Sequence, residues 1–108
     1  MAIILKDGVR FSPLRGEIYS IFQTLEEVFA ECAPSAQVVI TSANDSVHSV
    51  KSLHYTGFAI DVRSKNLSPV EKHAVLAKLK SLLDKNYDII LESEGKTNEH
   101  FHIEYDPK

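Results

Sequence analysis

Hydrophobic residues at steps of three and four predict an amphipathic helix in the first third of the chain. The apolar positions run from Leu14 to Cys32, with the spacing of one helix face. Ser12 followed by Pro13 is a typical helix start, and Pro34 marks the predicted end. Cys32 belongs to the apolar stripe, so we interpret it as a small core residue rather than a reactive thiol.

Two strand patterns follow this helix. The β-branched run 37–41 predicts a buried strand. After a polar stretch, residues 57–63 alternate with the period of a second strand. Its apolar face carries Phe58, Ile60 and Val62, and its other face carries Ala59, Asp61 and Arg63. One face of this strand therefore suits the core, and the other is available for another role.

A second helix and two closing strands complete the pattern. Residues 68–71, Ser-Pro-Val-Glu, form a capping box with proline at the first helical position. The helix that they open is predicted to end before Asn86. Residues 87–91 and 100–105 predict two more strands, and the polar connection between them, which contains Gly95, is typical of a hairpin.

This order of elements predicts one α+β domain over residues 1–108, with two main helices packed on one side of a mostly antiparallel sheet. A chain of 108 residues, 44% hydrophobic, can bury a core without disulfides. The net charge of −3 and the absence of clustered Lys or Arg argue against nucleic-acid binding. The apolar opening 1–5 is too short for a signal peptide or a membrane span. We therefore expect the protein to bind no membrane. We also expect it to be a monomer.

The candidate chemistry lies in a carboxylate and several of the five histidines. Asp61 stands among apolar strand residues, where a carboxylate is costly unless it is paired or bound to a cation. Alternation places His100 and His102 on one face of the last strand, although a solvated sheet face has the same pattern. His54, Asp61 and one of these imidazoles would make a three-ligand site open to water, which is the form of a catalytic zinc site.

Two motifs in this region resemble those of a known family. Residues 52–61, Ser-Leu-His-Tyr-Thr-Gly-Phe-Ala-Ile-Asp, match the pattern Ser-x-His-x-x-Gly-x-Ala-x-Asp, and residues 99–102, Glu-His-Phe-His, match an acidic residue three positions before a histidine. The chain thus resembles the D-alanyl-D-alanine carboxypeptidases and dipeptidases, zinc peptidases that include phage L-alanyl-D-glutamate endolysins. The resemblance covers about residues 39–105 and implies the α+β fold shared with lysostaphin-type peptidases and the hedgehog domain.

The resemblance also implies a mechanism. One catalytic Zn²⁺ would be held by His54, Asp61 and His102, with Glu99 as the general base. Zinc lowers the pKa of its bound water to about 7, and a carboxylate can transfer the proton of that water to the leaving amine. The implied substrates are peptidoglycan stem peptides, cut by a D-Ala-D-Ala carboxypeptidase or by an L-Ala-D-Glu endopeptidase. His100 either assists catalysis or only flanks Glu99.

One departure from the family affects substrate binding. Many members carry an Arg in the loop that corresponds to 40–48, and this chain has none there. Ser52 matches a serine that lies near substrate in the family. We expect His48 to occupy the vacant space or Arg63 to supply the charge. The alternatives are Asn44, Asp45 and Lys51. The missing Arg favours an endopeptidase.

Other classes of function stay open. A non-catalytic zinc-stabilised module, for wall binding or phage structure, would keep the same fold, but it has no need for the Glu99 carboxylate beside an open metal position. An α+β domain with coincidental histidines is the third possibility. We expect His73 to be a plain surface residue. With no signal peptide visible, we expect a cytoplasmic or phage-encoded protein that reaches the cell wall by holin-type release or as part of a particle.

Overall fold

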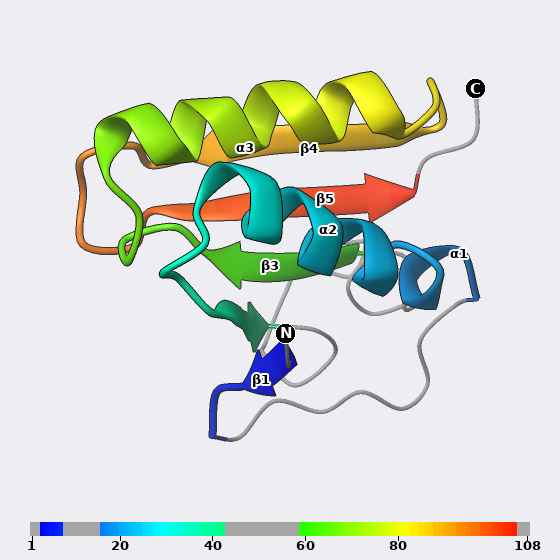
Figure 1. The fold of residues 1–108 in the computed structure, drawn as a ribbon. Coiled ribbons are helices and arrows are strands. Elements are labelled where there is room, and N and C mark those ends of the chain that lie inside the picture. Colours follow the sequence, from blue (N-terminus) through cyan, green and yellow to red (C-terminus); the bar gives the residue numbers. More distant parts are fainter. Residues whose placement is uncertain (1–2, 8–15, 43–58, 106–108) are drawn as a thin grey trace.

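A computed structural model of the chain describes residues 3–7, 16–42 and 59–105 (Figure 1). The helices in these ranges are α1 (Gly16–Tyr19), α2 (Phe22–Cys32) and α3 (Pro69–Leu82). The strands are β1 (Ile3–Leu5), β2 (Val38–Ser42), β3 (Ala59–Arg63), β4 (Tyr87–Glu92) and β5 (His100–Tyr105). They form one sheet in the order β1-β2-β3-β5-β4, and α2 and α3 lie side by side across one face of it. The α+β class and the single helical layer agree with the prediction.

The predicted first helix is divided into α1 and α2. The backbone N–H of Ile21 bonds to the carbonyl of Ile18 at 3.2 Å, which is a tighter turn than an α-helix makes. Within the described residues the predicted apolar stripe is nevertheless correct. Its α2 side chains Leu25, Val28 and Phe29 are buried. The helix ends at Cys32, which packs against the core, before Pro34 as predicted. The predicted start at residues 12–13 lies outside the described residues.

The capping box at the start of α3 is confirmed. Ser68 Oγ accepts a hydrogen bond from the Glu71 backbone N–H at 3.2 Å, and the Ser68 backbone N–H donates to Glu71 Oε1 at 2.8 Å. These two bonds satisfy donors that the first helical turn leaves unpaired. The helix then buries Val75 and Leu79 and ends before Asn86, as predicted. Within the described ranges, no helix combines the length and the apolar character needed to cross a membrane.

The sheet is mixed, which corrects the prediction of a mostly antiparallel sheet. Strand β1 pairs with β2 in parallel, with Ile3 opposite Val38. The pairs β2–β3, β3–β5 and β4–β5 are antiparallel, and the last is the predicted hairpin. The sequence did not indicate β1 because a strand of three residues is too short to show alternation. Only its pairing with β2 identifies it as a strand.

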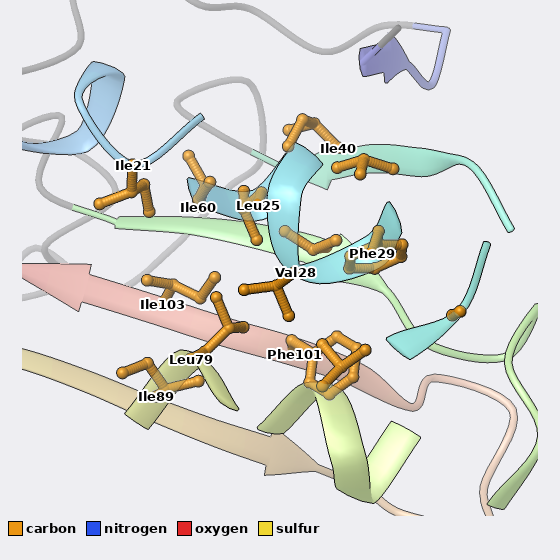
Figure 2. Close-up of a cluster of buried hydrophobic side chains, with 14 of the residues drawn as sticks. Ile21, Leu25, Val28, Phe29, Ile40, Ile60, Leu79, Ile89, Phe101 and Ile103 are labelled. Carbon is orange, nitrogen blue, oxygen red and sulfur yellow. The ribbon is translucent and has the colours of Figure 1, made fainter. Parts of the chain in front are cut away.

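The core lies between the helices and one face of the sheet (Figure 2). Figure 2 shows side chains of α2 and α3, such as Leu25, Phe29 and Leu79, gathered against Ile60 of β3 and Phe101 of β5. Because side chains alternate along a strand, the residues between these core positions belong to the opposite face. That face carries Asp61, Arg63, His100, His102 and Glu104.

We expect the Ser68→Ala substitution to lower the free energy of unfolding by about 1 kcal/mol, because the Glu71 N–H loses its acceptor. Ser81→Ala is the matched control at the other end of α3. Ser81 Oγ donates to the Lys78 carbonyl at 2.7 Å and caps no N-terminal donor, so its change should stay within about 0.5 kcal/mol. Urea unfolding measures both variants. Equal losses would contradict the capping role of Ser68.

Candidate metal centre

The candidate metal centre lies where β3, β5 and β4 present their polar faces side by side. Asp61 of β3 is directly opposite His102 of β5, and Arg63 is directly opposite His100. On the other side of β5, Glu92 of β4 is opposite His100. Opposed residues on one face have Cβ atoms about 4.5–5.5 Å apart. The sheet register alone therefore gathers two imidazoles and two carboxylates.

Asp61 and His102 are in direct contact, and Glu104 contacts the other side of the His102 ring. His102 Nδ1 lies 2.9 Å from Asp61 Oδ1, and His102 Nε2 lies 2.7 Å from Glu104 Oε1. The side chains of Asp61 and His102 are each only 14% exposed. Both ring nitrogens of His102 thus face a carboxylate, which holds the imidazole in one orientation.

His100 completes the group from the neighbouring position on β5. Its Nε2 lies 3.6 Å from Asp61 Oδ1 and 3.6 Å from Glu92 Oε1, while its Nδ1 lies 2.7 Å from the Asn98 carbonyl oxygen. Because a carbonyl oxygen only accepts hydrogen bonds, Nδ1 is the donor to Asn98, and Nε2 is the nitrogen that faces Asp61 and Glu92. Nε2 is therefore the atom with which His100 would bind a metal ion.

Asp61, His100 and His102 fit the donor set of a divalent cation. One ligand atom from each residue lies within 4.8 Å of the other two. Two imidazoles and a carboxylate are typical ligands of a catalytic zinc ion, which keeps its fourth position for water. This set shares Asp61 and His102 with the predicted ligands and contains His100 where the motif has His54. His54 lies outside the described residues.

The charge of His102 is controlled by its two carboxylate partners. Burial by itself lowers the pKa of His102, but the hydrogen bonds and charges of Asp61 and Glu104 raise this pKa from 6.5 to about 9. Without a metal ion the ring is therefore a cation at neutral pH, and a metal ion bound there would take the place of one ring proton. Glu104 is placed to accept a hydrogen bond from the other nitrogen, as carboxylates do behind metal-bound histidines.

Glu99, the predicted general base, makes a separate set of contacts. Lys72 of α3 donates to both of its carboxylate oxygens, at 2.8 and 2.9 Å, and the Gly95 backbone N–H donates at 3.0 Å. The Ser64 hydroxyl donates a fourth hydrogen bond. Glu99 is only 4% exposed. Glu99 precedes His102 by three positions. In an extended chain, side chains an odd number of positions apart point to opposite faces, so this spacing favours opposite faces for Glu99 and His102.

These contacts keep the Glu99 carboxylate ionised. Burial by itself raises the pKa of Glu99, but the Gly95 N–H, the Lys72 ammonium and the Ser64 hydroxyl outweigh it and lower this pKa from 4.5 to about 2. A carboxylate with so low a pKa accepts a proton poorly. In this arrangement Glu99 is an anchor for Lys72, and its role as general base stays a prediction.

The sequence reasoning missed Lys72 and Glu92. Lys72 precedes Val75 and Leu79 by three and seven positions, so helical spacing already indicates that it lies on the buried face of α3. Glu92 could have been placed on the polar face by extending the alternation of the predicted strand 87–91 by one residue. Lys72 pairs with Glu99, and Glu92 lies beside both histidines of the centre.

The other predicted residues fall into two groups. Arg63 is described and lies beside the centre, opposite His100. His73 is exposed on α3, with Nε2 2.6 Å from Glu94 Oε2, which confirms it as a surface residue. The remaining positions are outside the described residues. They are Asn44, Asp45, His48, Lys51, Ser52 and His54.

Comparisons of the chain with protein-family models, with curated proteins and with solved structures find no match. The centre is therefore interpreted from its own geometry and from the two motifs.

We expect Lys72→Met to lower the free energy of unfolding by about 3 kcal/mol or more, because it leaves the buried Glu99 carboxylate without its cation. Lys78→Met is the matched control on the same helix. The Lys78 side chain is 41% exposed and its Nζ lies 3.4 Å from Glu31, so its loss should cost less than about 1 kcal/mol. Urea unfolding at pH 7 measures both. Equal losses would contradict a buried pair.

Acid should weaken the wild-type fold through Glu99. Because the pKa of Glu99 is about 2 in the folded protein and its ordinary value is 4.5, its contribution to stability is complete above pH 4.5 and is lost as the pH falls toward 2. The double variant Lys72→Met, Glu99→Gln removes both partners and should lose this part of the pH dependence. Urea unfolding between pH 2.5 and 6 tests it. Parallel pH curves for the two proteins would show that Glu99 contributes nothing.

Glu104→Gln should weaken binding of a divalent metal by about 10- to 100-fold, because the amide orients and polarises His102 less well than the carboxylate. Glu94→Gln is the control, since Glu94 contacts the surface residue His73. Competition with a chromophoric chelator measures Zn²⁺ affinity. An unchanged affinity in Glu104→Gln would exclude Glu104 as a support for a metal ligand.

Proposed function

We propose that this protein is a zinc-dependent peptidase that cleaves the stem peptides of peptidoglycan. The observation that supports this most strongly is the 2.9 Å contact of Asp61 with His102. The two motifs assign these two residues to the metal, and the register of β3 and β5 makes them direct partners. Two patterns that are far apart in the sequence thus supply neighbouring ligands.

The zinc ligands in this proposal are Asp61, His102 and a third imidazole. The motif assigns the third position to His54, and His100 is the alternative that the described residues offer. Zinc bound there would polarise a peptide carbonyl and lower the pKa of its water to about 7. Asp61 supplies negative charge beside the ion, and Glu104 holds the His102 ring.

Two carboxylates compete for the role of general base. The motif assigns it to Glu99, which would have to release Lys72 in order to accept a proton. Glu92 lies on the metal face, where its Oε1 is 3.6 Å from both His100 Nε2 and His102 Nδ1. Its side chain is 44% exposed, so water and substrate can reach it.

The candidate substrates are the D-Ala-D-Ala terminus and the L-Ala-D-Glu bond of the stem peptide. In this proposal the protein acts as a monomer, and it is cytoplasmic or phage-encoded and reaches the wall by holin-type release or as part of a particle. A second candidate function is a non-catalytic zinc-stabilised module for wall binding or phage structure. The ion pair of Glu99 with Lys72 favours it, because a carboxylate used for stability is explained without catalysis.

The purified protein should bind one equivalent of Zn²⁺, and Asp61→Asn and His102→Ala should abolish binding. His54→Ala and His100→Ala identify the third ligand, whose removal should lower the affinity by more than about 100-fold. His73→Ala is the control. Elemental analysis and chelator competition measure content and affinity. Full metal binding by both Asp61→Asn and His102→Ala would overturn the assignment of the centre.

Zinc-loaded wild type should release D-Ala or cut L-Ala-D-Glu in defined muropeptides, measured by mass analysis of the products. Replacing the true base, by Glu99→Gln or Glu92→Gln, should lower kcat by about 10²- to 10⁴-fold with the metal retained. Urea unfolding of both variants separates a folding defect from a catalytic one. Zinc-loaded protein that cleaves neither bond would exclude the peptidase and leave the non-catalytic module.

A further inference from the structure

Strand β2 contains a bulge beside Asp61. Ile40 of β2 is opposite Val62 of β3, but Ser42, two positions further along β2, is opposite Asp61, which is only one position away from Val62. Over this stretch β2 therefore has one residue more than β3, and the extra residue is Thr41. Such bulges are frequent next to active sites, where they redirect a side chain.

The bulge moves Ser42 from the core face of the sheet to the polar face. In a regular register Thr41 would be opposite Asp61, and Ser42 would be opposite the buried Ile60. The sequence gives the same assignment, because Ser42 follows the core residue Ile40 by two positions. Directly opposed residues of an antiparallel pair share a face, so the observed pairing places Ser42 on the face of Asp61.

The bulge thereby brings two hydroxyls to Asp61. Thr41 Oγ1 donates to the Asp61 backbone carbonyl oxygen at 3.4 Å. Ser42 lies opposite the Asp61 side chain, and opposed residues have Cβ atoms about 4.5–5.5 Å apart. One hydrogen bond from a Ser hydroxyl to a carboxylate spans such a separation. Ser42 is only 7% exposed, so little water competes for that bond.

The two sides of the Asp61 carboxylate have different surroundings. Its Oδ1 lies 2.9 Å from His102 Nδ1 and 3.6 Å from His100 Nε2, so this oxygen belongs to the candidate metal site. Both histidines are on β5, which borders β3 on one side, whereas Ser42 is on β2, which borders β3 on the other. Ser42 thus approaches Asp61 from the side opposite to the histidines.

We propose that Ser42 is a positioning residue of the metal centre, whose hydroxyl donates a hydrogen bond to Oδ2 of Asp61 and so directs Oδ1 to the metal ion. This inference rests on the proposed zinc-dependent function and adds to it a residue that neither motif contains. Ser42 supports the carboxylate ligand as Glu104 supports His102. With Oδ2 held by Ser42, Asp61 binds the ion through one oxygen, and a coordination position stays open for water.

Removal of the hydroxyl tests this role without any substrate. Ser42→Ala should weaken Zn²⁺ binding by about 10- to 100-fold, because the carboxylate is no longer held in its binding orientation. Competition with a chromophoric chelator measures this. The d–d absorption of the Co²⁺-loaded protein should also change, because Oδ2 is then able to turn to the ion and raise its coordination number. A loss of packing alone would leave that spectrum unchanged.

Two further variants locate the effect. Ser42→Thr keeps a hydroxyl at this position and should restore both the Zn²⁺ affinity and the Co²⁺ spectrum. Thr41→Val is the matched control in the same bulge. It removes a long, weak bond to the Asp61 backbone and leaves the support of the carboxylate in place. Its Zn²⁺ affinity should change far less than that of Ser42→Ala, with the Co²⁺ spectrum of the wild type.

Wild-type affinity and spectrum in Ser42→Ala would overturn the role of Ser42 and leave the peptidase proposal intact. Equal effects of Thr41→Val and Ser42→Ala would also overturn it, as would no recovery in a Ser42→Thr protein whose metal-free form unfolds in urea like the wild type. The expected metal effects, without cleavage of muropeptides by the wild type, would overturn the peptidase and support the positioning role. A wild type that binds no Zn²⁺ would overturn this inference together with the metal centre.

Discussion

The antiparallel pairing of β3 with β5 is the constraint on which the candidate site depends. It sets Asp61 opposite His102 and Arg63 opposite His100, so one register builds the metal centre. A shift of one residue would turn every side chain of a strand to the other face. It would place Asp61 in the core and an apolar neighbour at the centre. Burial of the apolar face therefore fixes the register of β3 and β5, and this register sets the positions of the residues on the polar face.

The helices stabilise this register because their apolar stripes cover only one side of the sheet. Side chains of α2 and α3 pack against the inward residues of β3 and β5 (Figure 2). The polar face can then carry charged groups without placing them in the core. Among the described residues, Glu99 is the buried carboxylate near the site, and it pairs with Lys72 of α3, because an unpaired buried charge is strongly destabilising. Lys72 thus links the helical layer to the loop that precedes β5.

Much of this arrangement could be predicted from local patterns. The period of two correctly assigned the two faces in the described residues 59–63 and 100–105, and the capping box correctly placed the start of α3. The division of the first helix at Ile21 and the strand β1 could not be predicted, because each depends on a few residues whose conformation is set by distant partners. Within the site, Asp61 and His102 were predicted as partners and are in contact. Glu99 was predicted as the general base; it forms an ion pair with Lys72, and its catalytic role stays a prediction.

The sequence by itself determined which residues have the chemistry: the histidines, the strand carboxylate and the two motifs that contain them. It did so because hydrophobic periodicity separates the core face from the polar face within each element. The tertiary structure decided which of these groups meet. Contacts across strands, such as Glu92 with His100 and His102, and contacts between a helix and a loop, such as Lys72 with Glu99, join positions that no local period relates. The bulge that brings Ser42 opposite Asp61 is likewise set by the pairing of two distant strands.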